Sequence, residues 1–237
     1  MDHPDSRIES RNRRLQRAQE CAVDTGCSAP WNAWVDDDQL VHDALKCHSE
    51  QRTRMPTPEQ YSALSIEPRL GRLRHTSGDL ERAIAGKSDS ELSRRPRPDS
   101  WAAKEIVCHL RDVEELFQIR FHTVVALDEP RILVLGASAT DLAPWRIGGS
   151  IGHPLDPARW AEERQYLRND THEALTAFQR RRTEVLALLK SLSPAEWERG
   201  GIHLSQGRLT LADWVARLAA HDDNHLDQLR RTLEGRA

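Results

Sequence analysis

The clearest hydrophobic pattern in the chain lies near its end. Between Leu211 and Leu233, apolar residues recur at steps of three and four, which is the spacing of one buried face on an α-helix. Thr210 stands where an N-cap is expected, and Asp213 follows in the first turn, where the helix dipole favours a negative charge. The pattern therefore predicts one amphipathic helix over 211–233.

Two earlier segments show the same period. The segment 100–127 carries an apolar stripe, has Asp99 or Ser100 as its expected N-cap, and ends before a proline. The segment 171–191 carries an equally regular stripe. Each of these segments is long enough to cross a small bundle, so we expect them to be two of its principal helices.

A fourth helix is predicted over 58–84. Thr57 and Pro58 give it a strong start, an N-cap followed by proline at the first helical position, and we expect a kink or break near Pro68. Four helices in about 180 residues can enclose one core. The sequence therefore predicts an all-α fold, a four-helix bundle.

The connections carry weaker signals. Asp156 and Pro157 are expected to open an earlier segment of the 171–191 helix, and Ser193 begins a proline-led capping box that predicts a short helical turn. The stretch 131–155 contains several glycines and prolines and predicts a long loop. Such a loop either covers a substrate pocket or is a plain surface connection.

The first 55 residues differ from the rest. They are rich in arginine, aspartate and small polar residues and have little to bury, so we predict a flexible N-terminal extension over 1–55 and a bundle domain over 56–237. Met55 stands two residues before Thr57, and we hypothesise that translation begins there. An intact mass of 27.0 kDa for the native protein would contradict that hypothesis.

Net charge and hydrophobicity argue against two classes of protein, nucleic-acid binders and membrane proteins. A net charge of −3 does not favour a nucleic-acid binder, and the run 180–182 of three arginines is expected to be a solvated helix face. No apolar run reaches the roughly 20 residues of a membrane span. We therefore expect a cytoplasmic protein with neither nucleic acid nor membrane as a partner.

The four cysteines do not suggest a zinc finger. Three of them lie in the extension, and no CxxC occurs anywhere in the chain. A zinc site there is conceivable, but its spacings fit no finger pattern; the residues concerned are Cys21, Cys27, His42, Cys47 and His48. Cys108 is expected to be a small buried apolar residue.

Two histidines lie on the apolar side of the last helix. His221 and His225 are four residues apart, so both imidazoles project from one helical face. The pair is weak evidence alone, because such spacings arise by chance in a chain with 11 histidines and buried histidines are often merely hydrogen-bonded. The intervening residues also lack the glutamate of HExxH metalloproteases, and Asp222 is too short to replace it.

A third histidine strengthens the interpretation. His109 lies at the edge of the apolar stripe of 100–127, so packing the two helices side by side could bring it to the pair. Three neutral nitrogens would hold a divalent metal, with zinc, nickel and iron all acceptable, and leave positions open for water or substrate. The loop residue His153 is a weaker candidate for a fourth ligand, because loop histidines are usually solvated.

Several neighbours are candidates for supporting roles. Asp112 and Asp222 could each accept the second N–H of a metal-bound imidazole, or could make surface salt bridges instead. Gln228 could line the pocket or end the stripe. Trp101 and Trp214 are expected in the core, although either could form a wall of the site.

The three histidines and their neighbours resemble a known family, the DinB-like superfamily of metal-binding four-helix bundles, and most closely its YfiT-like branch. The resemblance covers about residues 58–234 and implies that His109, His221 and His225 are the metal ligands. The residues that carry it are Trp101, Glu105-Ile106-Val107, His109-Leu110, Asp112, Gly207-Arg208-Leu209-Thr210-Leu211, His221-Asp222, Asn224-His225 and Gln228-Leu229.

The resemblance narrows the chemistry without fixing it. Members include S-transferases that use thiols such as bacillithiol or mycothiol, a mycothiol-dependent maleylpyruvate isomerase, and proteins described only as metal-dependent hydrolases. It implies a metal-dependent transferase or hydrolase with a small-molecule substrate, and a low-molecular-weight thiol is a candidate cofactor; a homodimer is also expected. The alternative is a non-catalytic metal-binding or oligomerising stress-response module. An open metal position facing a cavity would favour the enzyme.

Overall fold

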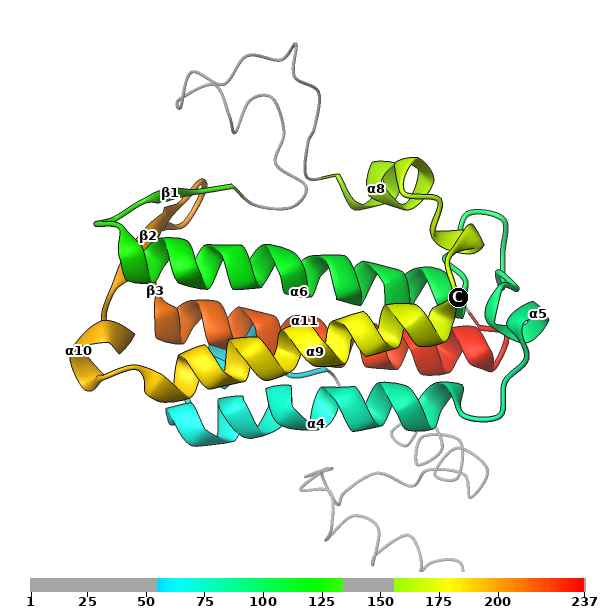
Figure 1. Ribbon diagram of the computed structural model, residues 1–237, viewed down its shortest axis with the longest axis horizontal. Helices are drawn as coiled ribbons and strands as arrows, with labels where there is room; N and C mark the ends of the chain where they lie inside the picture. The colour runs from blue at the N-terminus through cyan, green and yellow to red at the C-terminus, as the bar shows by residue number, and fades with distance from the viewer. Residues whose placement is uncertain (1–54, 134–155, 237) are drawn as a thin grey trace, which may run out of the picture. The chain divides into compact units, whose positions relative to one another are not determined.

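Four long helices form a bundle in the computed structural model, which describes residues 55–133 and 156–236 (Figure 1). The helices are α4 (Ile66–Ile84), α6 (Ala103–Ala126), α9 (Thr171–Ser191) and α11 (Leu211–Leu233). The predicted all-α four-helix bundle is confirmed. The predictions made for residues 1–54, for the loop 134–155 and for His153 lie outside the described residues.

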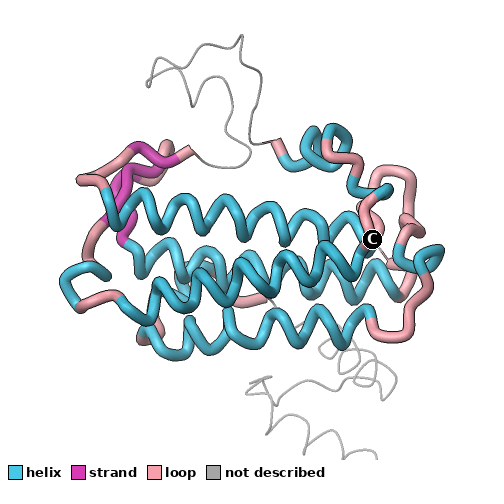
Figure 2. Tube along the Cα trace, viewed as in Figure 1, coloured by secondary structure: helices cyan, strands magenta, loops and turns pink. Residues whose placement is uncertain are grey.

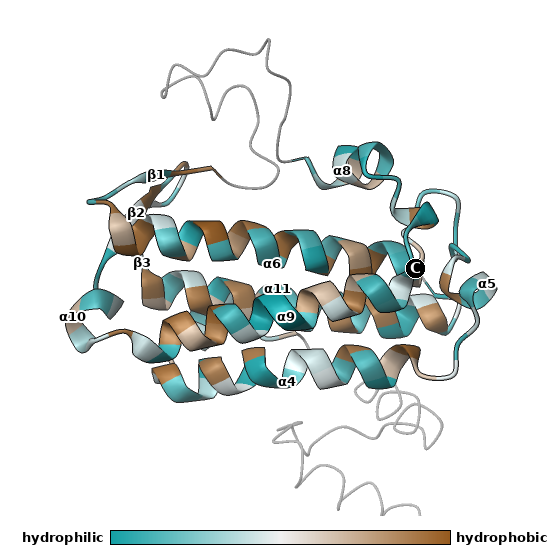
Figure 3. Ribbon diagram, in the orientation of Figure 1, coloured by the Kyte–Doolittle hydropathy of each residue, from teal (hydrophilic) through white to brown (hydrophobic). Residues whose placement is uncertain are grey.

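Each long helix packs against two others. α6 contacts α9 and α11, and α4 contacts the same two helices on the other side. All four carry hydrophobic and hydrophilic residues along their length, as Figure 3 shows. Two buried hydrophobic clusters follow one another along the bundle, one around Leu73, Phe117 and Trp214 and the other around Leu80, Phe178 and Leu226.

The first predicted helix is divided, but not where expected. A short helix, α3 (Pro58–Ser62), starts at the capping box of Thr57 and Gln60, and α4 begins after three residues. Pro68 is the third residue of α4, where the missing N–H would have no partner in the helix, so it causes no break. Leu64, between the two helices, is 45% exposed rather than buried.

The start of α6 also differs from the prediction. Its N-cap is Ala102 rather than Asp99 or Ser100, and the Glu105 carboxylate accepts a hydrogen bond from the Ala102 N–H at 2.8 Å. A neighbouring turn, α5 (Asp89–Leu92), precedes it. The glutamate thus makes one half of a capping box, the bond to the N–H of the N-cap residue, while Ala102 has no side-chain oxygen to make the other half.

The segments that flank α9 are mostly as predicted. α9 and α11 have the predicted bounds, and Ser193 caps the short α10 (Pro194–Trp197). Asp156 caps α8 (Pro157–Glu163), but α8 is a separate helix followed by the 3-10 turn η3 (Tyr166–Arg168), not an early part of α9.

A small sheet at one end of the bundle was not predicted (Figure 2). β1 (Arg131–Ile132) pairs in parallel with β2 (Gly200–His203), which pairs antiparallel with β3 (Gly207–Thr210). Gly200 and Gly201 are the first two residues of β2. A Cβ on Gly201 would lie 2.7 Å from a side-chain carbon of Ile132, so close strand packing requires a glycine there. β3 leads directly into α11.

Among the described residues, no helix is long and apolar enough to cross a membrane.

Candidate metal centre

The structure brings the three predicted histidines together. His109 comes from α6, and His221 and His225 lie one turn apart on α11. One ring nitrogen from each histidine lies within 4.8 Å of the others. The Nε2 atoms of His109 and His221 are 3.3 Å apart, close to the roughly 3.4 Å that separates two ligands on a tetrahedral metal with bonds of about 2.1 Å.

Burial keeps the three imidazoles neutral. It lowers the pKa of His109 to about 3, with a further contribution from His225, and lowers the pKa of His221 well below its usual value. The pKa of His225 is also lowered, mainly by burial. Neutral imidazole is the form that binds a metal, so the set offers three ligands without first losing protons.

Gln228 orients one of the rings. Its side-chain oxygen lies 2.8 Å from Nδ1 of His225, one turn earlier on α11. When Nδ1–H donates to this oxygen, Nε2 of His225 carries its lone pair toward the other two histidines. Of the candidates for supporting roles, Gln228 is the one that contacts a histidine side chain through a hydrogen bond.

The other two rings have free nitrogens. Nδ1 of His109 and Nδ1 of His221 are buried and have no hydrogen-bond partner among the described residues. Buried polar atoms in folded proteins are normally partnered. A metal at the facing Nε2 atoms, which lie 3.3 Å apart, would leave both Nδ1 atoms without a partner. The fit of a divalent metal therefore rests on the converging nitrogens of three neutral imidazoles.

An aromatic wall and a cavity adjoin the centre. The Trp101 ring lies 4.9 Å from the His109 ring and stacks at 6.4 Å and 15° on the His225 ring. Trp101, His225 and Gln228 line a cavity of about 580 Å³ between the start of α6 and the end of α11, within the usual size range of small-molecule sites. His221 and His225 are half-buried, whereas His109 is 2% exposed.

The family model for the DinB superfamily matches residues 72–229, which contain all three histidines and most of the four long helices. The chain belongs to the DinB superfamily. The resemblance inferred from its histidines and their neighbours is confirmed at this level.

Two relatives of this DinB chain are informative. A protein from Oceanobacillus iheyensis named "putative metal-dependent hydrolase" is 19% identical over 180 residues, covering 76% of this chain and 92% of the relative. A solved structure described as "YfiT from Bacillus subtilis is a probable metal-dependent hydrolase with an unusual four-helix bundle topology" matches with a TM-score of 0.59 and 21% identity. It covers 74% of this chain and 92% of that one. At this identity, the second match shows a common fold.

The two aspartates beside the histidines of this DinB bundle do not orient them. Asp112 is buried and accepts hydrogen bonds from Tyr166, at 2.6 Å, and Arg111, at 2.8 Å. Asp222 is buried and accepts from Thr76 and Arg182. Neither aspartate therefore accepts a hydrogen bond from a triad imidazole. The ion pair of Asp222 with Arg182 lies inside the bundle, whereas Asp112 also pairs with Arg164, whose side chain is 45% exposed, which agrees with the surface salt bridge considered for it.

Arg182 is not the solvated charge that its place in an arginine run suggested. It is 1% exposed, and all three of its guanidinium nitrogens are hydrogen-bonded, to both oxygens of Glu114, both oxygens of Asp222 and the Leu73 carbonyl. With Thr76 these side chains form a buried layer, contributed by all four long helices. On α4, α9 and α11 it lies between the residues of the two hydrophobic clusters, and on α6 it lies next to Val113 at the edge of the first cluster. We call it the Arg182 layer.

Cys108 is buried, as predicted. Its sulfur faces the Tyr166 carbonyl at 3.9 Å, and burial raises the pKa of the thiol to about 11. Such a thiol is protonated at neutral pH and is not a nucleophile.

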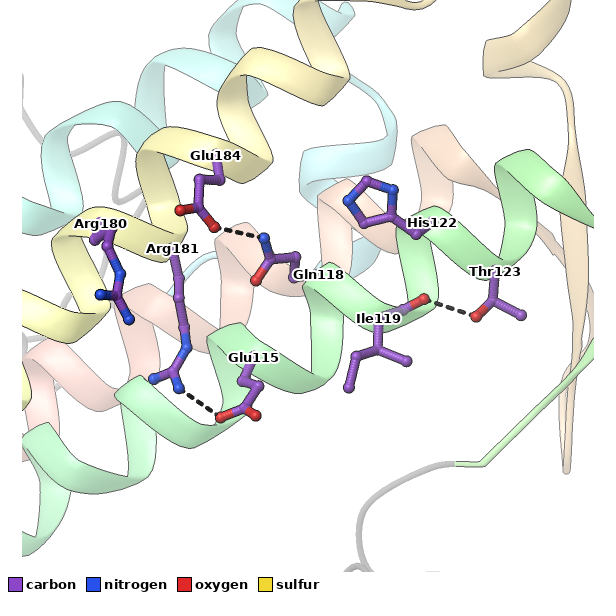
Figure 4. Close-up of a pocket in the computed structure, with 8 residues that line it drawn as sticks. All are labelled: Glu115, Gln118, Ile119, His122, Thr123, Arg180, Arg181 and Glu184. Carbon is purple, nitrogen blue, oxygen red and sulfur yellow. Dashed lines mark hydrogen bonds and ion pairs between the residues drawn. The ribbon is translucent and has the colours of Figure 1, made fainter.

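A second cavity lies between α6 and α9, is lined by His122 among others, and includes no residue of the triad (Figure 4). Its walls are tied together by an ion pair between Arg181 and Glu115 and by a hydrogen bond from Gln118 to Glu184, both 2.7–2.8 Å. Paired charged and polar side chains of this kind are typical of a solvated surface groove.

Proposed function

We propose that the protein is a metal-dependent enzyme, a hydrolase or a thiol-dependent S-transferase, whose metal is held by His109, His221 and His225. The observation that carries the proposal is the convergence of three neutral imidazole nitrogens beside a cavity. When bound there, zinc, nickel or iron would lower the pKa of a coordinated water or thiol and so supply a nucleophile at neutral pH.

The side chains around the triad have separable roles. The Gln228 oxygen holds the proton on Nδ1 of His225, which leaves Nε2 as a ligand. Trp101 forms one wall and is placed to exclude water from one side of a bound substrate. Because the ring of His225 lines the cavity, a small molecule can approach the triad, and this favours the enzyme over a non-catalytic metal-binding module.

If the nucleophile is a thiol, we propose that a small molecule supplies it. The buried Cys108 is protonated, and the described residues that line the cavity include no cysteine. The relative from Oceanobacillus iheyensis supports hydrolysis through its name alone. Hydrolysis and thiol transfer are therefore two forms of one proposal, which differ in whether water or a low-molecular-weight thiol attacks.

The test compares metal-free and metal-loaded protein in two assays. One follows the hydrolysis of p-nitrophenyl esters, and the other follows the conjugation of mycothiol or cysteine to monochlorobimane. We expect one activity to appear on loading with zinc, nickel or iron(II) and to disappear in His225→Ala, but not in the control His172→Ala at an exposed histidine. Metal-loaded protein without activity in either assay, or an active His225→Ala variant, would contradict the proposal.

A further inference from the structure

A second buried arginine, Arg120 on α6, has no carboxylate partner among the described residues. It is 5% exposed, its Nε has no hydrogen-bond partner there, and one terminal nitrogen donates to the Leu133 carbonyl at 2.5 Å. Its guanidinium lies over the rings of Phe117, at 4.9 Å, and Trp214, at 5.3 Å. Burial alone lowers the pKa of Arg120 to about 10.

Other donors gather around this guanidinium. Nε1 of Trp214 is buried and has no partner among the described residues. The His203 ring on β2 lies 5.6 Å from the Trp214 ring, and its Nδ1 accepts a hydrogen bond from the Ser205 N–H at 3.2 Å. The proton of a neutral His203 is therefore on Nε2, which makes that atom a third donor.

The same region is electropositive. Burial lowers the pKa of His203, and the charges of Arg217 and then Arg120 lower it further. Arg217 lies on α11 one turn before His221 and on the same helical face. Trp214 is two turns before His221, roughly 10 Å along the helix axis. Arg217 and Trp214 thus follow one another along α11 away from the triad, and Arg120 on α6 and His203 on β2 lie beside Trp214.

An uncompensated buried charge costs several kcal/mol, so this arrangement calls for an anion. A carboxylate matches the guanidinium fork, because its two oxygens can accept from two nitrogens at once. A phosphate dianion would bring two negative charges to one buried cation. The chemistry therefore favours a carboxylate.

We propose that Arg120, Trp214 and His203 form a binding site for the carboxylate group of a small molecule, with Arg217 between this site and the triad. We further propose that the carboxylic acid is the substrate or the thiol cofactor, with its carboxylate at Arg120 and its reactive end at the triad. This second part of the proposal rests on the proposed function. The site itself would bind a carboxylate with or without a metal.

The test observes the Trp214 indole directly. The ¹⁵N-labelled, metal-free full chain is titrated with sodium butyrate at constant ionic strength, and the Trp214 Nε1–H signal, assigned by its loss in Trp214→Phe, is followed by NMR. We expect a saturable shift in the millimolar range. Absence of saturation with butyrate, or saturation with inorganic phosphate alone, would overturn the proposal.

Variants make the result specific. We expect Arg120→Met to weaken butyrate binding at least tenfold, and Arg120→Lys, which keeps the charge but loses the fork, to weaken it as well. The matched control is Arg199→Met, because Arg199 also donates to backbone carbonyls, those of Val124 and Leu127, and should leave binding unchanged. If Arg120→Met does not fold, Arg120→Lys decides; unchanged binding in the folded variant would overturn the site.

The two proposals can fail separately. Butyrate binding that persists in His109→Ala supports the carboxylate site, even if that protein and the wild type bind no metal. Butyrate binding that appears only after metal loading would assign the carboxylate to the metal and overturn this site while leaving the triad intact.

Discussion

The Arg182 layer and the histidine triad are two groups of polar side chains inside the bundle, and each takes one of two adjacent residues of α11. They differ in how far their hydrogen-bonding atoms have partners. In the layer, every nitrogen of Arg182 has an acceptor, and both carboxylates are paired. In the triad, two imidazole nitrogens have no partner among the described residues. Asp222 belongs to the first group and His221 to the second.

The difference separates a structural centre from a binding centre. A satisfied polar layer needs nothing more and joins all four helices at one height of the bundle. The triad instead offers the converging lone pairs of three neutral imidazoles, which a metal can use. Arg120 resembles the triad, because its guanidinium has no carboxylate partner and its Nε has no hydrogen-bond partner among the described residues.

The largest expected effect comes from breaking the layer. Arg182→Met would leave Glu114 and Asp222 buried without a cation, and we expect it to lower the free energy of unfolding by about 3–5 kcal/mol. Urea denaturation of metal-free protein measures this. In the control Arg181→Met, which removes a partly exposed ion pair with Glu115, we expect a loss of about 1 kcal/mol or less. Equal losses in the two variants would show that the layer is not the structural centre.

Acid should destabilise the triad in metal-free protein. In the unfolded chain, a histidine takes up a proton below about pH 6.5, whereas in the folded chain burial keeps the pKa of each of the three lower. The unfolded state therefore binds more protons, and stability falls as pH drops below 6.5. Between pH 7 and pH 5, we expect His109, whose pKa burial lowers to about 3, to account for about 2 kcal/mol of lost unfolding free energy, and the lowered pKa values of His221 and His225 to act in the same direction.

A variant isolates this pH effect. His221→Gln should remove one histidine's share of the fall, and His172→Gln, at an exposed position, should leave the fall as it is in wild type. Urea denaturation at the two pH values gives the comparison. An unchanged fall in His221→Gln would mean that the triad is not the source of the acid sensitivity.

The smallest effect concerns the orientation of His225. Gln228→Ala should weaken metal binding about 10- to 100-fold, because Nδ1 loses the acceptor that fixes the ring and its tautomer. Competition with a chelator measures the affinity. Asn224→Ala is the control, since Asn224 lines the same cavity and is exposed. Equal affinities in the two variants would remove Gln228 from the metal centre.

The parts of the fold that the sequence predicted are those set by local signals. The bounds of α9 and α11 follow from helical periodicity and from caps such as Thr210. The N-cap of α6 was placed wrongly because the prediction looked for a polar N-cap residue. The N-cap is Ala102, and the Glu105 side chain accepts the hydrogen bond of the Ala102 N–H. The small sheet was missed because its strands are short and include three glycines.

The candidate site could be predicted only in part, because some of its features depend on contacts between helices. His109 could be joined to His221 and His225 because all three lie on helix faces of known period and in a familiar sequence context. Arg182 and Arg120 are buried because of the residues that other helices place opposite them. The hydrophobic pattern of a single helix contains no information about those residues. The role of Gln228 could have been found, because it stands three residues after His225 on the same helix.

The central claim is that the triad binds a metal, and metal content tests it most directly. The full-length protein, purified without a histidine tag or added metal, is measured by mass spectrometry beside His109→Ala and His225→Ala. The account predicts about one zinc, nickel or iron per chain in the wild type and none in either variant. Metal-free wild type that also takes up none of the three on titration would contradict it.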